Sequence, residues 1–170
     1  MNDEVLFTES QRFKQWWLWL ILLVIDGFLL YGILWQVLMG HPIGDRPMTD
    51  KGLLAAAGLM TLMTILFASI RLESRITMEG INVKFFPFQL SFRKYSWNQV
   101  SKSFVRKYNP ISEYGGWGIR LGFFGKGNAL NISGNKGLQL EFTNNKKLLI
   151  GTNKPAELTA ALGKIGQLKL

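Results

Sequence analysis

Long apolar runs fill most of the first part of the chain. The first run covers residues 16–39 and is interrupted only by Asp26 and Gln36. A helix of this length spans about 36 Å, which is enough to cross the ~30 Å hydrocarbon core of a bilayer with some tilt. The second run, residues 52–70, contains no charged residue. The pattern predicts two transmembrane helices joined by a short external loop over residues 40–51.

A signal peptide and a soluble helical hairpin are the two other interpretations of the apolar runs. A signal peptide is disfavoured because the first run is longer than an h-region and no small-residue cleavage pattern precedes Gln36. A soluble helical hairpin needs polar faces, and neither run has one. Aromatic residues also lie toward both ends of the first run, as in an interfacial belt. These residues are Trp16, Trp17, Trp19, Tyr31 and Trp35.

Asp26 is an acidic residue near the middle of the first predicted span. A charge at this depth costs about 2.5–3.5 kcal/mol on insertion scales. In an antiparallel hairpin, residue 26 lies at the depth of residues 64 and 65, so Thr61 or Thr64 is expected to hydrogen-bond it. The alternative is a proton or ion pathway, but one polar residue in two spans does not make such a path alone. We therefore expect Asp26 to join the two helices, or two copies of the chain.

From residue 76 onward, short alternating runs replace the helical period and predict β-strands. Glu79-Gly80 and Asn144-Asn145 are expected turns between strands. Pro155 and the apolar stripe that follows it predict an amphipathic C-terminal helix. The predicted strands contain the following residues: Ile76 and Met78; Ile81, Val83 and Phe85; Leu90 and Phe92; residues 100–108; Trp117, Ile119, Leu121 and Phe123; Leu130 and Ile132; Leu138, Leu140 and Phe142; and residues 146–152.

Two further segments of this half carry a pattern. Residues 113–137 hold eight of the chain's eighteen glycines, but neither the P-loop spacing nor the dinucleotide-binding spacing is present, and no helix follows. These glycines are therefore expected at turns and bulges. In "FFPF", residues 85–88, Pro87 marks a turn or an edge. Its three phenylalanines either complete the core or face the bilayer near the second span, and we expect at least two of them in the core.

Charge is distributed unevenly along the chain. Residues 71–170 carry sixteen Lys and Arg against five acidic residues, an excess of eleven positive charges. Arg71 and Arg75 directly follow the second span, whereas the basic residues of the loop are offset by acidic ones. The positive-inside rule places the domain of residues 72–170 in the cytoplasm, and with two spans the head of residues 1–15 as well. The chain has no cysteine, which fits a non-oxidising compartment.

A family resemblance rests on segments that follow the two spans. "ITMEGINVKFFPF", "YSWNQVSKSFVRKYNP", "GGWGIR", "SGNKGLQLEF" and "LIGTNKPAEL" resemble small bacterial membrane proteins with two N-terminal spans and a pleckstrin-homology-like (PH-like) domain. The resemblance covers roughly residues 72–165. It implies an α+β domain with a bent, seven-stranded antiparallel barrel capped by the C-terminal helix. Such domains bind inositol phosphates through a basic pattern around the first hairpin, and this pattern is incomplete here because residue 95 is Tyr.

No set of residues predicts catalysis. His41 is the only histidine and lies in the loop between the spans, so with no cysteine it makes no conventional zinc site. Ser133 has no histidine partner. We therefore expect a protein that is not an enzyme and has no catalytic residue, cofactor or metal.

Surface charge is the remaining candidate chemistry. A basic domain tethered under an anionic leaflet is attracted to it, at about 1 kcal/mol for each cation near the surface. We expect a binding or assembly module at the inner (plasma) membrane that contacts anionic lipids without headgroup preference, or contacts a protein partner or a second copy. A solvated basic face is the alternative, and nucleic-acid binding is not expected. The expected basic face comprises Arg93, Lys94, Lys102, Arg106, Lys107 and Arg120, with Lys126 nearby.

The alternative function is that of a scaffold subunit of a larger membrane complex, which acts through its transmembrane helices. Gly52 and Ala56 are small residues at helical spacing, which allows close helix packing.

Overall fold

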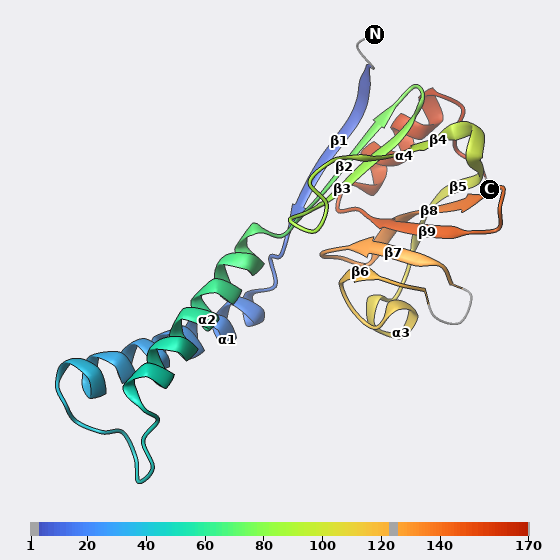
Figure 1. The fold of residues 1–170 in the computed structure, drawn as a ribbon. Coiled ribbons are helices and arrows are strands. Elements are labelled where there is room, and N and C mark those ends of the chain that lie inside the picture. Colours follow the sequence, from blue (N-terminus) through green and yellow to red (C-terminus); the bar gives the residue numbers. More distant parts are fainter. Residues whose placement is uncertain (1–3, 123–125, 170) are drawn as a thin grey trace. The chain divides into compact units, whose positions relative to one another are not determined.

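The computed structural model describes residues 4–122 and 126–169. The chain divides into two compact units (Figure 1). Residues 14–69 form the helical unit, and residues 1–13 together with 70–170 form the domain. The expected combination of two long apolar helices with an α+β domain is therefore present.

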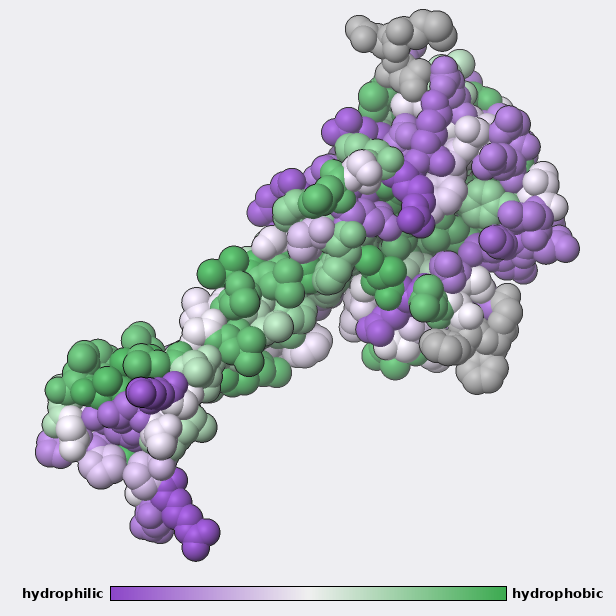
Figure 2. All heavy atoms as spheres, in the orientation of Figure 1, coloured by the Kyte–Doolittle hydropathy of each residue, from purple (hydrophilic) through white to green (hydrophobic). Residues whose placement is uncertain are grey.

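The helical unit contains α1 (Trp16–Gly32), its π-helical continuation η1 (Ile33–Leu38), and α2 (Asp50–Ser69). By length and composition, Trp16–Leu38 and α2 are each able to cross a membrane. Only 11% and 6% of their most apolar windows are buried, and Figure 2 shows apolar side chains covering their surface. Such exposure fits lipid-facing helices better than a hairpin in a soluble core.

The second helix begins two residues earlier than the apolar run. The Thr49 hydroxyl accepts a 3.2 Å hydrogen bond from the backbone N–H of Gly52, which satisfies a donor of the first turn. Gln36 connects the end of the first helix to the start of α2, because its amide donates to Met48 O at 2.6 Å and to Asp50 Oδ1 at 2.8 Å. Polar side chains thus set this end of α2, and hydropathy alone did not predict it.

The domain contains two sheets. The first is antiparallel in the order β1-β2-β3-β4, and the second has the order β5-β8-β9-β7-β6. Figure 1 shows α4 alongside these strands. The bounds are β1 (Val5–Arg12), β2 (Arg71–Thr77), β3 (Gly80–Phe86), β4 (Arg93–Ser96), η2 (Trp97–Gln99), β5 (Val100–Lys107), α3 (Pro110–Tyr114), β6 (Gly118–Arg120), β7 (Asn128–Asn131), β8 (Lys136–Phe142), β9 (Lys147–Gly151) and α4 (Pro155–Lys164).

Strand β1 was not predicted, because residues 1–15 were assigned to a separate head. It pairs antiparallel with β2, from Val5 opposite Thr77 to Arg12 opposite Arg71. Its inward positions are Phe7, Glu9 and Gln11. Two of these three are polar, so the strand lacks the alternation of apolar and polar residues by which strands are recognised.

The structure does not confirm the seven-stranded antiparallel barrel. The described residues form nine strands in two sheets, and the sheets are not closed into one barrel. One pair, β7 with β9, is parallel. The helix α3 and the strands β6 and β7 together form an excursion between β5 and β8. Strands were predicted in the regions of β6 and β7 but not in that of β1.

The core and α4 follow the predicted pattern. Helix α4 buries Leu158, Ala161 and Leu162 and contacts β1 and β5, one strand of each sheet. The largest fully buried apolar side chains come mainly from both sheets, namely Phe85, Leu72, Ile76, Ile81, Ile132, Leu138, Leu140, Leu149, Ile150, Leu162 and Val83.

Most described glycines of residues 113–137 lie outside helices and strands, as expected, whereas Gly118 and Gly137 lie in β6 and β8. Asn109 caps α3 by accepting hydrogen bonds from the N–H groups of Ile111 and Ser112. Gly115 ends this helix with φ of 70°, a conformation that glycine adopts without steric cost. The predicted strand from Trp117 to Phe123 is shorter in the structure, where β6 ends at Arg120, and Phe123 lies outside the described residues.

Candidate functional site

A cavity of about 450 Å³ opens in the domain, between β4 of the first sheet and the β8–β9 hairpin of the second. Its lining combines cations, amides and apolar groups and includes no Asp or Glu. The lining residues are Arg93, Lys94, Tyr95, Gln99, Asn128, Phe142, Asn144, Lys146, Lys147 and Leu148. Cations beside amide donors, with no carboxylate among them, favour binding of an anionic group.

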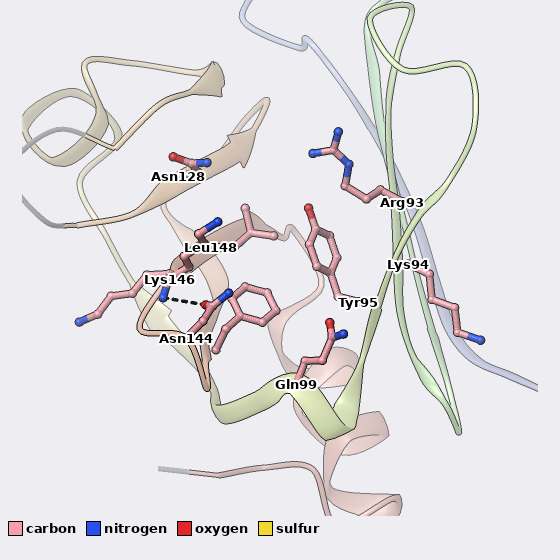
Figure 3. A pocket seen from close by; sticks show the side chains of 10 residues that line it. Arg93, Lys94, Tyr95, Gln99, Asn128, Asn144, Lys146 and Leu148 are labelled. Carbon is pink, nitrogen blue, oxygen red and sulfur yellow. Dashed lines mark hydrogen bonds between the residues drawn. The ribbon is translucent and has the colours of Figure 1, made fainter.

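The edge strand β4 supplies one wall of this cavity. Arg93 pairs with Val83 and Tyr95 pairs with Ile81, and both partners are fully buried core residues. Because alternate residues share a face, Arg93 and Tyr95 are on the inner side of the strand. Figure 3 shows both side chains directed into the cavity and Lys94 directed away from it. Lys94 forms an ion pair with Glu79 instead.

The β8–β9 turn supplies the opposite wall. Asn145 has φ of 62°, as expected for this turn. Asn144 Oδ1 accepts a 3.1 Å hydrogen bond from the backbone N–H of Lys146 (Figure 3). The ring centroids of Tyr95 and Phe142 lie 5.5 Å apart, so this contact connects the two walls. Local turn chemistry therefore fixes the backbone beneath Lys146 and Lys147.

Two of the lining cations carry charge that no carboxylate offsets. Lys147 Nζ lies 3.2 Å from Glu141 Oε1. Arg93 and Lys146 form no ion pair with any carboxylate of the described residues. The cavity therefore keeps a net positive charge at Arg93 and Lys146.

Arg106 was predicted as a surface cation but lies in a bonded network on the second sheet. Its guanidinium lies 2.9 Å from Glu113 Oε2 and donates to Gln139 Oε1 at 3.1 Å and to the Tyr114 hydroxyl at 3.1 Å. Asn109 N–H donates to Glu113 Oε1 at 2.7 Å. These bonds hold α3 against β5 and β8, so Arg106 stabilises the fold rather than presenting a charge.

The network shifts two pKa values. Burial alone raises the pKa of the Glu113 carboxyl, but hydrogen bonds from Arg106 and Asn109 and the charges of Arg106 and Lys126 together lower it. Burial alone lowers the pKa of the Arg106 guanidinium, but the contacts with Glu113 and Tyr114 outweigh burial and raise this pKa above its ordinary value. Each charge therefore keeps its partner ionised.

The structure distributes the other predicted cations over several surfaces. Arg93 and Lys94 lie on β4, while Lys102 and Lys107 lie exposed on β5. Arg120 lies on β6, at the edge of the second sheet opposite β5, and its Nε donates to Trp117 O at 3.0 Å. Of the six predicted positions, Arg93 and Lys94 line the cavity. The Asn-Asn turn followed by two lysines is a visible signal in the sequence for this wall of the cavity. The lining residues that were not predicted as site residues include Lys146, Lys147, Asn128, Asn144, Gln99 and Tyr95.

Asp26 forms the expected bond within the helical unit. Thr64 Oγ1 donates a 2.6 Å hydrogen bond to Asp26 Oδ2, which joins α1 to α2. Asp26 Oδ1 is also buried, and no donor among the described residues reaches it.

Comparison of the chain with protein-family models, curated proteins and solved structures finds no significant match. Among the described residues, no group of three or more His, Cys, Asp or Glu side chains is arranged to hold a metal ion. The function is therefore argued from the geometry of the site.

Proposed function

We propose that this chain is a two-span membrane protein whose domain is a non-catalytic binding module for the anionic headgroups of the adjacent leaflet. The observation that carries the proposal is the cavity whose lining includes Arg93, Lys146 and Lys147 and no carboxylate. Arg93 and Lys146 are the two cations that bind the lipid phosphates, because no carboxylate of the described residues competes for them.

The pairing of β1 with β2 supports the anchored arrangement. β1 precedes the first apolar helix and β2 follows the second, and the two strands share a sheet. If both helices cross the membrane, both strands lie on the same side, as an even number of crossings requires. By the positive-inside rule, the excess of basic residues in the domain supports a cytoplasmic location of that side, at the inner (plasma) membrane.

The strand connectivity supports a PH-like origin of the domain. Without the excursion α3-β6-β7, seven strands remain, namely β1 to β5, β8 and β9, and every sheet pairing among them is antiparallel. The C-terminal helix contacts one strand of each sheet. We propose that the domain is a PH-like barrel that opens between β4 and the β8–β9 hairpin and gains a cation-lined cavity there.

The leaflet attraction is electrostatic in this proposal. Each cation close to an anionic surface contributes about 1 kcal/mol. Lys146 is exposed on the β8–β9 turn, and a flexible lysine recognises phosphate as a point charge rather than by a fixed geometry. We therefore expect binding that depends on lipid charge, with little preference for one anionic headgroup.

The test uses the full chain in nanodiscs, with a fluorophore on Asn145→Cys beside the cavity and an acceptor dye on a trace lipid. Adding phosphatidylglycerol to neutral lipid is expected to raise energy transfer at ~0.1 M salt. Raising the salt to 1 M is expected to reverse the increase, because the Debye length falls from about 10 Å to about 3 Å. No response to phosphatidylglycerol contradicts the leaflet proposal and favours a protein partner.

A charge-matched control locates the contact. Arg93→Gln with Lys146→Gln removes two cavity cations, whereas Lys107→Gln with Lys136→Gln removes two cations from a cross-strand pair outside the cavity. Loss of the response only in the cavity variant supports the proposed site. Equal loss in both variants supports a delocalised basic surface instead.

The second candidate is a scaffold that acts through its helices. The buried and unsatisfied Asp26 Oδ1 favours it, because a donor from another helix satisfies this atom. A chain reduced to residues 14–69 is expected to retain a partner bound in this way and to lose one bound by the domain.

A further inference from the structure

Both connections between the two units leave from one end of the first sheet. Arg12, the last residue of β1, pairs with Arg71, the first residue of β2. Only residues 13–15 separate β1 from α1, and only Ile70 separates α2 from β2. A residue spans at most about 3.6 Å, so a membrane crossed by both helices holds this end of the sheet beside its surface.

A turn with exposed apolar side chains leaves from the same end. Phe86 pairs with Arg71, and residues 87–92 follow it as the β3–β4 turn. Phe88 is 61% exposed and Leu90 is 80% exposed, so both carry apolar surface whose burial would gain free energy. Of the three phenylalanines in residues 85–88, only Phe85 is fully buried, so the expectation of two in the core was wrong.

Local contacts hold this turn in shape. The backbone N–H of Gln89 donates to Phe85 O at 2.8 Å, and the Gln89 side chain accepts from the N–H of Phe85 at 3.3 Å. The ring centroids of Phe85 and Phe88 lie 6.2 Å apart. Because Phe85 is buried in the core, these contacts fix the backbone of the turn that carries Leu90.

Three cations lie over the aromatic rings that flank the turn. The Arg71 guanidinium lies 4.9 Å from the centre of the Phe86 ring. Arg75 and Lys84 lie 4.4 Å and 4.8 Å from the centre of the Phe92 ring. This arrangement suits a lipid surface. The apolar side chains of the tip can enter the acyl boundary, and the cations behind them can contact the phosphate layer.

We propose that the β3–β4 turn inserts Phe88 and Leu90 into the interface of the bilayer that α1 and α2 cross. Arg71, Arg75 and Lys84 then lie at the level of the lipid phosphates. Glu73 offsets part of this charge, because it pairs with Arg71 at 2.9 Å and with Lys84 at 3.1 Å. The inference rests on the proposed membrane anchoring but not on the cavity. Insertion is driven by apolar burial, so it persists in neutral lipid, in which the cavity has no anionic headgroups to bind.

The test is a depth measurement by spin labelling, for which the absence of native cysteine removes background labelling. The full chain is reconstituted in neutral lipid with one label at Leu90→Cys. The control label is at Met78→Cys, an apolar side chain that is 60% exposed on the β2–β3 turn at the opposite end of the sheet. A seven-residue strand separates the two ends by about 23 Å.

The label at position 90 is expected to relax faster with oxygen, which partitions into lipid, than with a water-soluble nickel complex. The label at position 78 is expected to show the reverse. Equal nickel accessibility at both positions overturns the inference. Protection of position 90 from both reagents also overturns it, because that result identifies a protein contact or a second copy of the chain.

A third label separates this inference from the proposed function. Leu62 is 59% exposed on α2, so Leu62→Cys reports whether that helix lies in lipid. Oxygen accessibility at position 62 with nickel accessibility at position 90 rejects turn insertion and leaves the anchoring intact. Nickel accessibility at position 62 rejects the membrane anchoring and, with it, the insertion.

Discussion

The Thr152 hydroxyl donates a 2.6 Å hydrogen bond to Glu9 Oε2 in the interior of the domain. Glu9 Oε1 accepts a second bond from the backbone N–H of Asn153 at 2.8 Å. Beside them, the Gln11 amide donates to Gly151 O at 2.6 Å. Polar side chains that precede the two apolar helices are therefore bonded to the end of β9 and to the loop that follows it.

The first prediction concerns the boundaries of the folding domain. Replacing residues 13–70 by a short turn such as Asn-Gly is expected to give a soluble, folded protein, because Arg12 and Arg71 are already paired. We call this protein the linked domain. Residues 71–170 alone lose β1 and the burial of Phe7, which contributes roughly 1.5–3 kcal/mol. Thermal unfolding of the two proteins makes the comparison, and equal cooperativity would show that β1 is dispensable.

The second prediction concerns Glu9. Glu9→Ala in the linked domain leaves the buried Thr152 hydroxyl and the part-buried N–H of Asn153 without their acceptor, so we expect a loss of about 1.5–3 kcal/mol in the free energy of unfolding. Glu4→Ala is the control, because Glu4 is exposed and precedes β1. Thr152→Val removes one of the donors, so its effect in a double-mutant cycle is expected to be non-additive with Glu9→Ala. Strict additivity contradicts a direct bond.

The sequence was sufficient for those elements that have a local signal. The two apolar runs predicted the long helices, and Asn144-Asn145 predicted a turn in which Asn145 adopts positive φ. Pro155 and the apolar stripe after it predicted α4. In each case, neighbouring residues alone determine the conformation.

Elements that depend on distant partners were missed. β1 places Glu9 and Gln11 in the core, where Gln11 donates to Gly151 of β9 and Glu9 accepts from the loop that follows it. Arg106 looked like a surface cation because Glu113, its partner, belongs to α3, which was not predicted. The cavity is lined by Arg93 from a strand of the first sheet and by Lys146 from the β8–β9 turn of the second, and no local pattern encodes that approach.

The third prediction concerns the bond between the helices. Thr64→Val removes the donor to Asp26 and is expected to destabilise the full chain in nanodiscs by about 0.6 kcal/mol and by no more than about 1.7 kcal/mol, the mean and the maximum for interhelical hydrogen bonds. Thr61→Val is the matched control, since Thr61 is exposed one turn away. Asp26→Asn retains an acceptor for Thr64 and is expected to preserve assembly. A proton flux that Asp26→Asn abolishes would instead assign the carboxylate to an ion pathway.

The fourth prediction is a pH dependence caused by Glu113. Its pKa is lower in the folded protein than the ordinary value of 4.5, so the folded state binds fewer protons than the unfolded state as the pH falls below about 4.5. The ionised carboxylate therefore stabilises the fold above this pH. That contribution is lost as the pH falls through the folded pKa.

Glu113→Gln in the linked domain removes this dependence. We expect the variant to be less stable than the parent at neutral pH by about 1.5–3 kcal/mol, because it loses a charged partner of Arg106. The difference in melting temperature is expected to shrink as the pH falls below 4.5, since the parent carboxylate then becomes neutral too. Glu157→Gln is the control, because this carboxylate is 62% exposed and its pair with Lys154 contributes little. A difference that is constant with pH contradicts the role of the Glu113 charge and leaves only the shape of the side chain to explain the loss.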